Sequence, residues 1–203
     1  MKDVLFKVCA VNTADIDAQL RQSHLHPKRR KRIAALNRKE AIAASLLGDH
    51  LARELAAELC CCDPQTLMVA EGQYGRPVLQ GADAEISIAH SGIYAAAAAA
   101  KCPVGIDLEK RRPVSHSIPM RLFSLEEQAW LDQAQDAYLD RFFRLWTMKE
   151  AYGKMRGFGI FSSKQFYAHF VQNELLVLYP DCLFQFPGAP DGYYLSVCVE
   201  REK

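Results

Sequence analysis

The chain has 203 residues, of which 50% are hydrophobic and 24% are charged, values that are ordinary for one large globular domain or two small ones. Its formal net charge of +1 excludes a globally basic nucleic-acid-binding protein and an acidic, disordered chain. Any recognition of anions must therefore depend on local clusters of basic residues.

No targeting signal is evident near the N-terminus, because Val4-Leu5-Phe6 is bracketed by charged residues and cannot form the apolar core of a signal peptide. The longest charge-free apolar stretch, residues 86–100, contains serine, histidine and glycine and is too short for a membrane span. The 7 cysteines, three of them adjacent at 60–62, fit neither a disulfide framework nor a zinc site. We expect a cytoplasmic protein with reduced thiols that binds neither nucleic acid nor membranes.

The first half of the chain predicts a β-strand at residues 4–11, followed by a basic run at residues 28–32 that leads into a long helix. Hydrophobic residues recur in this helix at spacings of three to five, which predicts one buried face. They are Ile42, Leu46, Leu47, Leu51, Leu55 and Leu59. The helix is expected to end at Asp63-Pro64. A turn at residues 74–77 and a strand at residues 85–89 follow.

The alanine run at residues 95–100 favours a helix by propensity, but its flanks look extended, and we predict a strand. Residues 103–108 predict another strand, and Ser124-Leu125-Glu126-Glu127 has the form of a capping box that opens a helix. A third helix is predicted from about Asp140 to Arg156, where Gly157 ends it, and residues 166–199 alternate as short strands.

Each half of the chain therefore predicts strands with one major helix. The fold class expected from this order is α+β, with an N-terminal lobe at residues 1–103 and a C-terminal lobe at residues 104–203.

Acidic residues alternate in the predicted strand Gly105-Ile106-Asp107-Leu108-Glu109. Because strand side chains point to opposite faces in turn, Asp107 and Glu109 should share one face. Two neighbouring carboxylates repel each other, and a divalent cation is a usual way to keep both ionised. A solvated strand end would explain the same pentapeptide, so this pattern alone does not define a site.

The third predicted helix places Trp146, Glu150 and Lys154 on one face at intervals of four residues. Such a Glu–Lys pair usually indicates only a solvated helix, but the tryptophan one turn away suggests that the face is partly covered. A partly covered carboxylate needs a partner, which favours a metal site built from Asp107, Glu109 and Glu150.

Other polar segments would suit a phosphate-bearing ligand. Ser87 to Gly92 places His90 and two serine hydroxyls where a strand becomes a loop, and Arg76 lies beside a rigid turn. Arginine can form two parallel hydrogen bonds with phosphate, although a basic run is more often a solvated surface.

The segments V-G-I-D-L-E at 104–109 and W-T-M-K-E-A-Y-G-K at 146–154 together resemble the 4′-phosphopantetheinyl transferase superfamily, Sfp type. Residues 46–49, 74–77 and 87–92 also look like segments of this family, so the resemblance covers roughly residues 26–165. It implies two similar lobes related by a pseudo-twofold, each a small mainly antiparallel sheet packed with a long helix. It also implies a monomer.

The resemblance implies Mg²⁺-dependent transfer of the 4′-phosphopantetheine arm of coenzyme A to a serine of an apo carrier protein, with release of adenosine 3′,5′-bisphosphate. The acceptor could be an acyl, peptidyl or polyketide carrier, and Mn²⁺ could replace Mg²⁺. By similarity, Asp107, Glu109 and Glu150 hold the metal, and Glu150, directly or through water, is the candidate base. Lys154 and His90 complete the catalytic set by binding pyrophosphate oxygens. The coenzyme-binding residues by similarity are Lys28, Arg29, Arg32, Ser45, Gly75, Arg76, Pro77, Ala89, His90 and Lys154.

The sequence departs from the family at Ala41 and Ala44, where similar proteins usually carry an aspartate and an arginine. This departure implies weaker contacts to coenzyme A and motivates a second hypothesis, a noncatalytic homologue that binds carriers or nucleotides. A third hypothesis is another Mg²⁺-dependent phosphoryl or nucleotidyl enzyme, because paired acidic residues also suit that chemistry.

Overall fold

The computed structural model describes residues 4–115, 117–157, 168–171, 174–176 and 181–201. Its helices are α1 (Ile16–Gln22), α2 (Pro27–Ala34), α3 (Lys39–Cys60), α4 (Ser117–Leu122), α5 (Leu125–Asp132) and α6 (Tyr138–Arg156), with 3₁₀ helices η1 (Pro64–Thr66), η2 (Gln73–Gly75) and η3 (Gln135–Ala137). Its strands are β1 (Leu5–Ala10), β2 (Met68–Glu71), β3 (Pro77–Gln80), β4 (Glu85–Ser91), β5 (Tyr94–Ala100), β6 (Val104–Lys110), β7 (His169–Val171), β8 (Glu174–Leu176), β9 (Cys182–Gln185) and β10 (Tyr193–Glu200). Within the described ranges, no helix combines the length and the apolar character that crossing a membrane requires.

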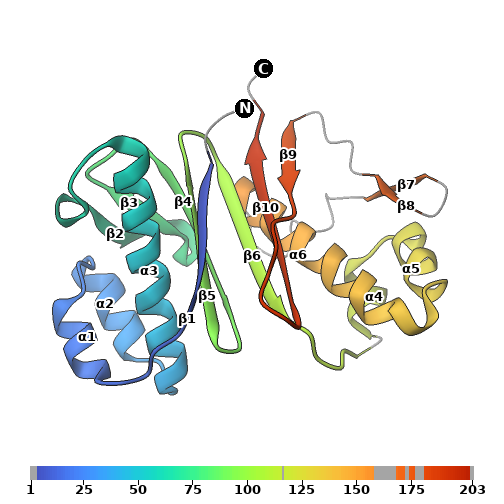
Figure 1. Ribbon diagram of the computed structural model, residues 1–203, viewed down its shortest axis with the longest axis horizontal. Helices are drawn as coiled ribbons and strands as arrows, with labels where there is room; N and C mark the ends of the chain where they lie inside the picture. The colour runs from blue at the N-terminus through green and yellow to red at the C-terminus, as the bar shows by residue number, and fades with distance from the viewer. Residues whose placement is uncertain (1–3, 116, 158–167, 172–173, 177–180, 202–203) are drawn as a thin grey trace.

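Two three-stranded antiparallel sheets form the centre of the molecule, in the orders β1-β5-β4 and β6-β10-β9. Figure 1 shows them side by side, with α3 on the outer face of the first sheet and α6 on the outer face of the second. The predicted α+β class, with antiparallel sheets packed on long helices, is confirmed. The pseudo-twofold relation and the boundary at residue 103 stay predictions.

The alanine run forms β5, as predicted, and all six alanines from Ala95 to Ala100 are 0% exposed. Ala97 and Ala99 pack in the core beneath α3, whereas Ala96 and Ala98 pack in a second core with residues of β6 and β10. A strand buried on both faces loses its polar alternation. Small side chains let a helix and a second sheet approach it closely, and tertiary packing outweighs the helix propensity of alanine.

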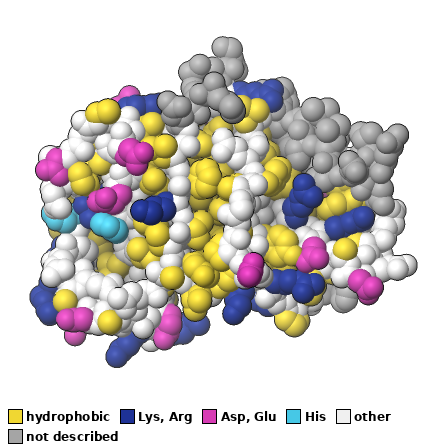
Figure 2. Space-filling model, viewed as in Figure 1, with side chains coloured by type: hydrophobic (Ala, Val, Ile, Leu, Met, Phe, Trp, Pro, Cys, Tyr) yellow, Lys and Arg dark blue, Asp and Glu magenta, His cyan; other side chains and the backbone are white. Residues whose placement is uncertain are grey.

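The second of these cores lies at the junction of the two sheets and reaches the surface. Partly buried hydrophobic residues surround it. Figure 2 shows hydrophobic side chains running down the middle of this face, between the first sheet with α3 and the second sheet with α6, which are called the two lobes below. The junction is therefore an apolar contact in the main.

The predicted long helix is α3, and its apolar stripe packs against the first sheet. The helix ends at Cys60, because Cys61 adopts a left-handed conformation with φ of 51°, rather than at Asp63-Pro64 as predicted. The basic run is a separate helix, α2, that begins at Pro27. Gly48 allows close packing of α3 on β4, since a Cβ there would lie 2.5 Å from Ile88 Cγ2.

The predicted capping box is present, with Ser124 and Glu127 bonding each other's backbone amides at the start of α5. Glu127 is 0% exposed and also pairs with Lys149 Nζ on α6 at 2.9 Å, so a buried ion pair joins the two helices. Gly157 ends α6 with φ of 77°, as predicted. The predicted C-terminal strands correspond to β7–β10, while residues 166–167, 172–173 and 177–180 lie outside the described residues.

Candidate active site between the lobes

The two carboxylates of β6 lie on one face of the strand, as the alternation predicts. Ile106 and Leu108 are buried in the core between the lobes, while Asp107 faces the opposite way, toward α6. Asp107 is 6% exposed, and its Oδ1 accepts a hydrogen bond from Lys154 Nζ at 2.8 Å. Its buried Oδ2 has no partner among the described residues. Burial raises the pKa of Asp107, which Lys154 counteracts.

Glu109 is held from two sides through one oxygen. Its Oε2 accepts a hydrogen bond from Ser91 Oγ at 3.0 Å and from Arg112 Nη1 at 2.6 Å. Arg112 also lies over the Phe143 ring, with 5.4 Å between Cζ and the ring centroid. The sequence prediction missed Arg112, although its position three residues after Glu109 was an available signal.

Glu150 projects from α6 toward the same acidic group. It is partly buried, and its Oε1 is a second buried carboxylate oxygen without a partner in the described structure. Burial, followed by the repulsion of Asp107, raises the pKa of Glu150 to about 7. Trp146 stacks on Phe142 at 5.7 Å, so the prediction that this helix face is partly covered is confirmed.

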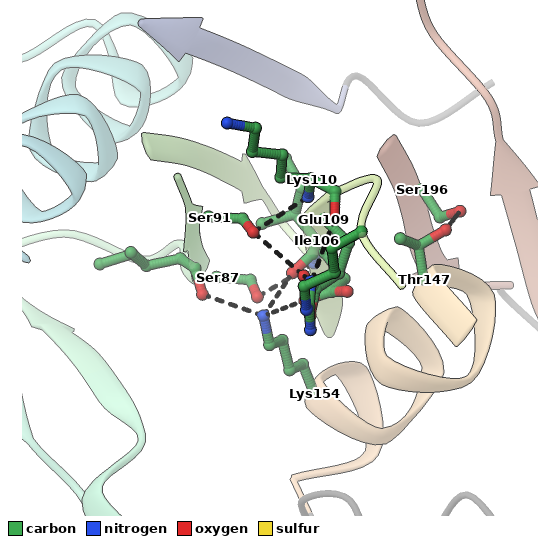
Figure 3. A network of polar contacts seen from close by, with 11 residues as sticks. Ser87, Ser91, Ile106, Glu109, Lys110, Thr147, Lys154 and Ser196 are labelled. Carbon is green, nitrogen blue, oxygen red and sulfur yellow. Dashed lines mark hydrogen bonds and ion pairs between the residues drawn. The ribbon is translucent and has the colours of Figure 1, made fainter. Parts of the chain in front are cut away.

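Lys154 connects the two lobes at the acidic group. Its ammonium donates to Ile106 O on β6 at 2.9 Å and to Ile88 O on β4 at 3.3 Å, in addition to Asp107. Figure 3 shows Lys154 extending from α6 to the space between the two strands. A cation at this position compensates a buried carboxylate and remains able to contact a ligand, because 29% of its side chain is exposed.

One cavity adjoins this group at Lys154, and a second cavity neighbours the first. The first, about 180 Å³, is lined by predicted residues Gly75, Arg76, Pro77 and Lys154. The second, about 150 Å³, is lined by Arg29, Arg32, Ser45 and His90. The structure therefore brings most of the predicted coenzyme-binding residues together at two neighbouring cavities. His90 in the second cavity is close enough to Lys154 in the first for their charges to interact. Partial desolvation and then Lys154 lower the pKa of the His90 imidazole.

Several of these residues already have partners. Arg29 is 7% exposed and forms two hydrogen bonds with Asp49, at 2.8 and 2.6 Å. Arg32 Nη1 donates to Gly75 O at 3.1 Å, so it links the two cavities. Arg76 pairs with Glu85 at 2.7 Å. Arg32 and Arg76 thus remain accessible cations, whereas Arg29 mainly holds α2 against α3.

Two predicted coenzyme-binding residues line neither cavity. Ala89 is 4% exposed and packs in the core between the lobes, and Lys28 is an exposed residue of α2. The two alanines that depart from the family pattern also differ in whether they line a cavity. Ala41 lines the second cavity, whereas Ala44 is buried in α3 at 4% exposure. Only the first of these alanines is therefore placed to affect a ligand directly.

The donor set fits a hard divalent cation, which prefers carboxylate oxygens. Two buried carboxylate oxygens lack partners among the described residues, and Asp107 and Glu109 both raise the pKa of Glu150, so these carboxylates repel one another. As placed, with Lys154 on Asp107 and Arg112 on Glu109, no three His, Cys, Asp or Glu side chains of the described chain are arranged as a metal site. A cation would offset both the repulsion and the loss of solvation.

The raised pKa of Glu150 predicts how stability depends on pH without metal. Folded Glu150 releases its proton at about pH 7 rather than 4.5, so the folded state should lose stability as pH rises from about 4.5 to 7. The part due to Glu150 should be on the order of 1 to 2 kcal/mol, after allowance for solvent screening. Thermal unfolding in a chelator at pH 5 and pH 8 measures it. Glu150→Gln should flatten the difference, and an equally steep loss in that variant would contradict the assignment.

Comparison with known proteins places these observations in a family. Residues 103–186 match the family model of the 4′-phosphopantetheinyl transferase superfamily, a range that contains the three carboxylates and Lys154. The chain is 31% identical to the 4′-phosphopantetheinyl transferase Sfp of Bacillus subtilis strain 168, over 87% of this chain and 83% of that protein. It is 29% identical to the transferase ffp of Bacillus subtilis, over 88% and 84% of the two chains. It is 30% identical to the transferase psf-1 of Bacillus pumilus, over 77% and 71%.

Proposed function

The chain belongs to the 4′-phosphopantetheinyl transferase superfamily and is a transferase, and we propose that it transfers the 4′-phosphopantetheine arm of coenzyme A to a serine of an apo carrier protein. The reaction would release adenosine 3′,5′-bisphosphate. The observation that carries this proposal is a pair of buried carboxylate oxygens, on Asp107 and Glu150, that have no partner in the described part of the chain. They lie beside Lys154, which lines the first cavity.

Coenzyme A would bind across the two neighbouring cavities. Gly75, Arg76 and Pro77 line the first and would flank the adenine. Arg32 and Ser45 line the second and, with Arg29, would face the 3′-phosphate, where arginine can form paired hydrogen bonds. Lys154 and His90 would contact the pyrophosphate. Of these cations, Arg32, Arg76 and Lys154 are partly exposed and can exchange present partners for phosphate oxygens.

Asp107, Glu109 and Glu150 would hold the divalent metal, Mg²⁺ or Mn²⁺, which when bound neutralises charge on the pyrophosphate. The bond that forms joins the carrier serine oxygen to the β-phosphorus, and the bond that breaks is the phosphoanhydride. Glu150, directly or through water, would accept the serine proton. Lys154 would stabilise negative charge on the transferred group.

The carrier, the metal and the assembly are also part of the proposal. Acyl, peptidyl and polyketide carriers all present the required serine. We further propose that the protein is a cytoplasmic monomer. A monomer is consistent with a site to which both halves of one chain contribute, through Ser91 and Ile88 on one side and Asp107 and Lys154 on the other.

The test is incubation of the protein with coenzyme A, Mg²⁺ and a panel of apo carriers, followed by mass spectrometry. We expect one carrier type to gain the mass of the phosphopantetheine arm, with no gain when a chelator replaces Mg²⁺ or when the carrier serine is replaced by alanine. Absence of any gain across the panel would contradict the proposal. Binding without transfer would support a noncatalytic homologue, and turnover of nucleotides without an acceptor would support a different phosphoryl enzyme.

A further inference from the structure

Strands β4 and β6 belong to different sheets, yet two serine hydroxyls join them. Ser87 Oγ accepts a hydrogen bond from Ile106 N at 3.1 Å, and Ser91 Oγ accepts one from Lys110 N at 3.0 Å. Both bonds connect residues 19 apart, so the strands run in the same direction with a constant offset. The hydroxyls take the role that a backbone ladder has within a sheet, and they set the register of one lobe against the other.

The sequence of β4 explains why serines occupy these positions. Side chains at alternate positions of a strand share a face. Ile86 and Ile88 pack beneath α3, while Ala89 packs in the core between the lobes. Ser87 and Ser91 lie on the same face as Ala89, toward β6. A face with small side chains lets the two strands approach, and its two hydroxyls satisfy β6 amides that would otherwise lack partners.

The two serines differ in one respect. A hydroxyl has one proton to donate and can accept two hydrogen bonds. Since Ser91 Oγ already accepts from Lys110 N, its proton is available for Glu109 Oε2 at 3.0 Å. Ser87 makes the equivalent bond to the β6 backbone, but no bond to a carboxylate is described for it. Figure 3 shows Ser91 directed at Glu109 and Ser87 directed at the Ile106 backbone.

We propose that Ser91 is a positioning residue of the transfer site: it orients the Glu109 carboxylate from the opposite lobe. The inference rests on the proposed function, in which Glu109 is a metal ligand. With Oε2 engaged by Ser91 and Arg112, Oε1 is the oxygen left for the metal. Hydrogen bonds to a ligating carboxylate fix its direction and are a common determinant of metal affinity. Metal binding at β6 therefore depends on contact between the lobes through one hydroxyl.

The experiment compares Ser91→Ala, Ser91→Thr and Ser87→Ala with the unmodified full-length protein. Binding of Mn²⁺ is measured directly from the paramagnetic signal of the free ion at saturating coenzyme A, because Ser87 lines the first cavity and its substitution could alter coenzyme binding. Carrier modification is a separate assay. Ser87→Ala is the matched control, because it also leaves a β6 amide without its hydroxyl partner. We expect Ser91→Ala to raise the dissociation constant for Mn²⁺ about tenfold, Ser91→Thr to restore it, and Ser87→Ala to leave it unchanged. Both alanine variants should lower the thermal unfolding midpoint.

Unchanged Mn²⁺ affinity in Ser91→Ala would overturn the inference. Equal weakening in Ser87→Ala would also overturn it, because metal affinity would then follow the lobe contact in general rather than the bond to Glu109. Failure of the proposed function is a distinguishable result, since the unmodified protein would then modify no carrier. If the unmodified protein binds no Mn²⁺, the metal assignment fails, and the role of Ser91 fails with it.

Discussion

Glu150→Gln should lower the rate of carrier modification by about 10²- to 10⁴-fold while leaving the protein folded, because the amide cannot accept the serine proton. The substitution preserves side-chain shape and removes one charge from three mutually repelling carboxylates. The folded state without metal should therefore be no less stable at pH 8 than that of the unmodified protein. Loss of activity with retained stability separates a chemical role from a structural one.

Initial rates from mass spectrometry of the carrier measure this loss, with thermal unfolding as the companion measurement. Glu126→Gln is a suitable control, because Glu126 is an exposed carboxylate in the first turn of α5. It should retain the full rate. If Glu150→Gln also retained the full rate, neither the base nor the metal role could belong to Glu150.

Gly105→Ala should destabilise the protein by about 3 kcal/mol or more, at the upper end of the range for overpacked cores. A Cβ at position 105 would lie 1.8 Å from Ala151 O and 2.7 Å from Met155 N. Both atoms belong to the backbone of α6, so no side-chain rearrangement could relieve the clash. The helix would have to move away from β6, and Glu150 would move with it relative to Asp107.

Urea denaturation of Gly105→Ala measures the loss, and carrier modification should fall as well. Gly188→Ala provides the control, since nothing lies within 4 Å of a Cβ at that position and the new methyl group would meet open space. Equal stability of the two variants would show that α6 does not pack on β6 at the described distance.

Periodicity in the sequence predicted the parts of the site that depend on a single element. The alternation around Asp107 placed both carboxylates of β6 on one face, and the four-residue spacing from Trp146 to Lys154 identified the face of α6 that points toward Asp107. These patterns are local, because the geometry of one strand or one helix determines them. The strand at Ala95 to Ala100 was predicted from its flanks rather than from its own composition.

Contacts between elements were beyond such patterns. Arg29 was predicted as a phosphate contact, but nothing local indicates that Asp49, 20 residues away, would accept hydrogen bonds from its Nε and Nη2. The hydroxyls of Ser87 and Ser91 were interpreted as phosphate contacts, whereas they bond β6 across a boundary between two sheets. Which strands lie beside each other across the junction of the lobes depends on tertiary packing, and no periodicity in a single sequence reveals it.

The six alanines of β5 have a mechanical consequence for the junction between the two sheets. Alternate methyl groups of this strand contact the core beneath α3 and the core that joins the lobes, with 0% exposure throughout. A longer side chain at Ala96 or Ala98 would thicken the layer between the lobes and stretch the hydrogen bonds from β4 to β6. The spacing between the two sheets, and with it the distance from Ser91 to Glu109, thus depends on six alanine methyl groups that can make no polar contact of their own.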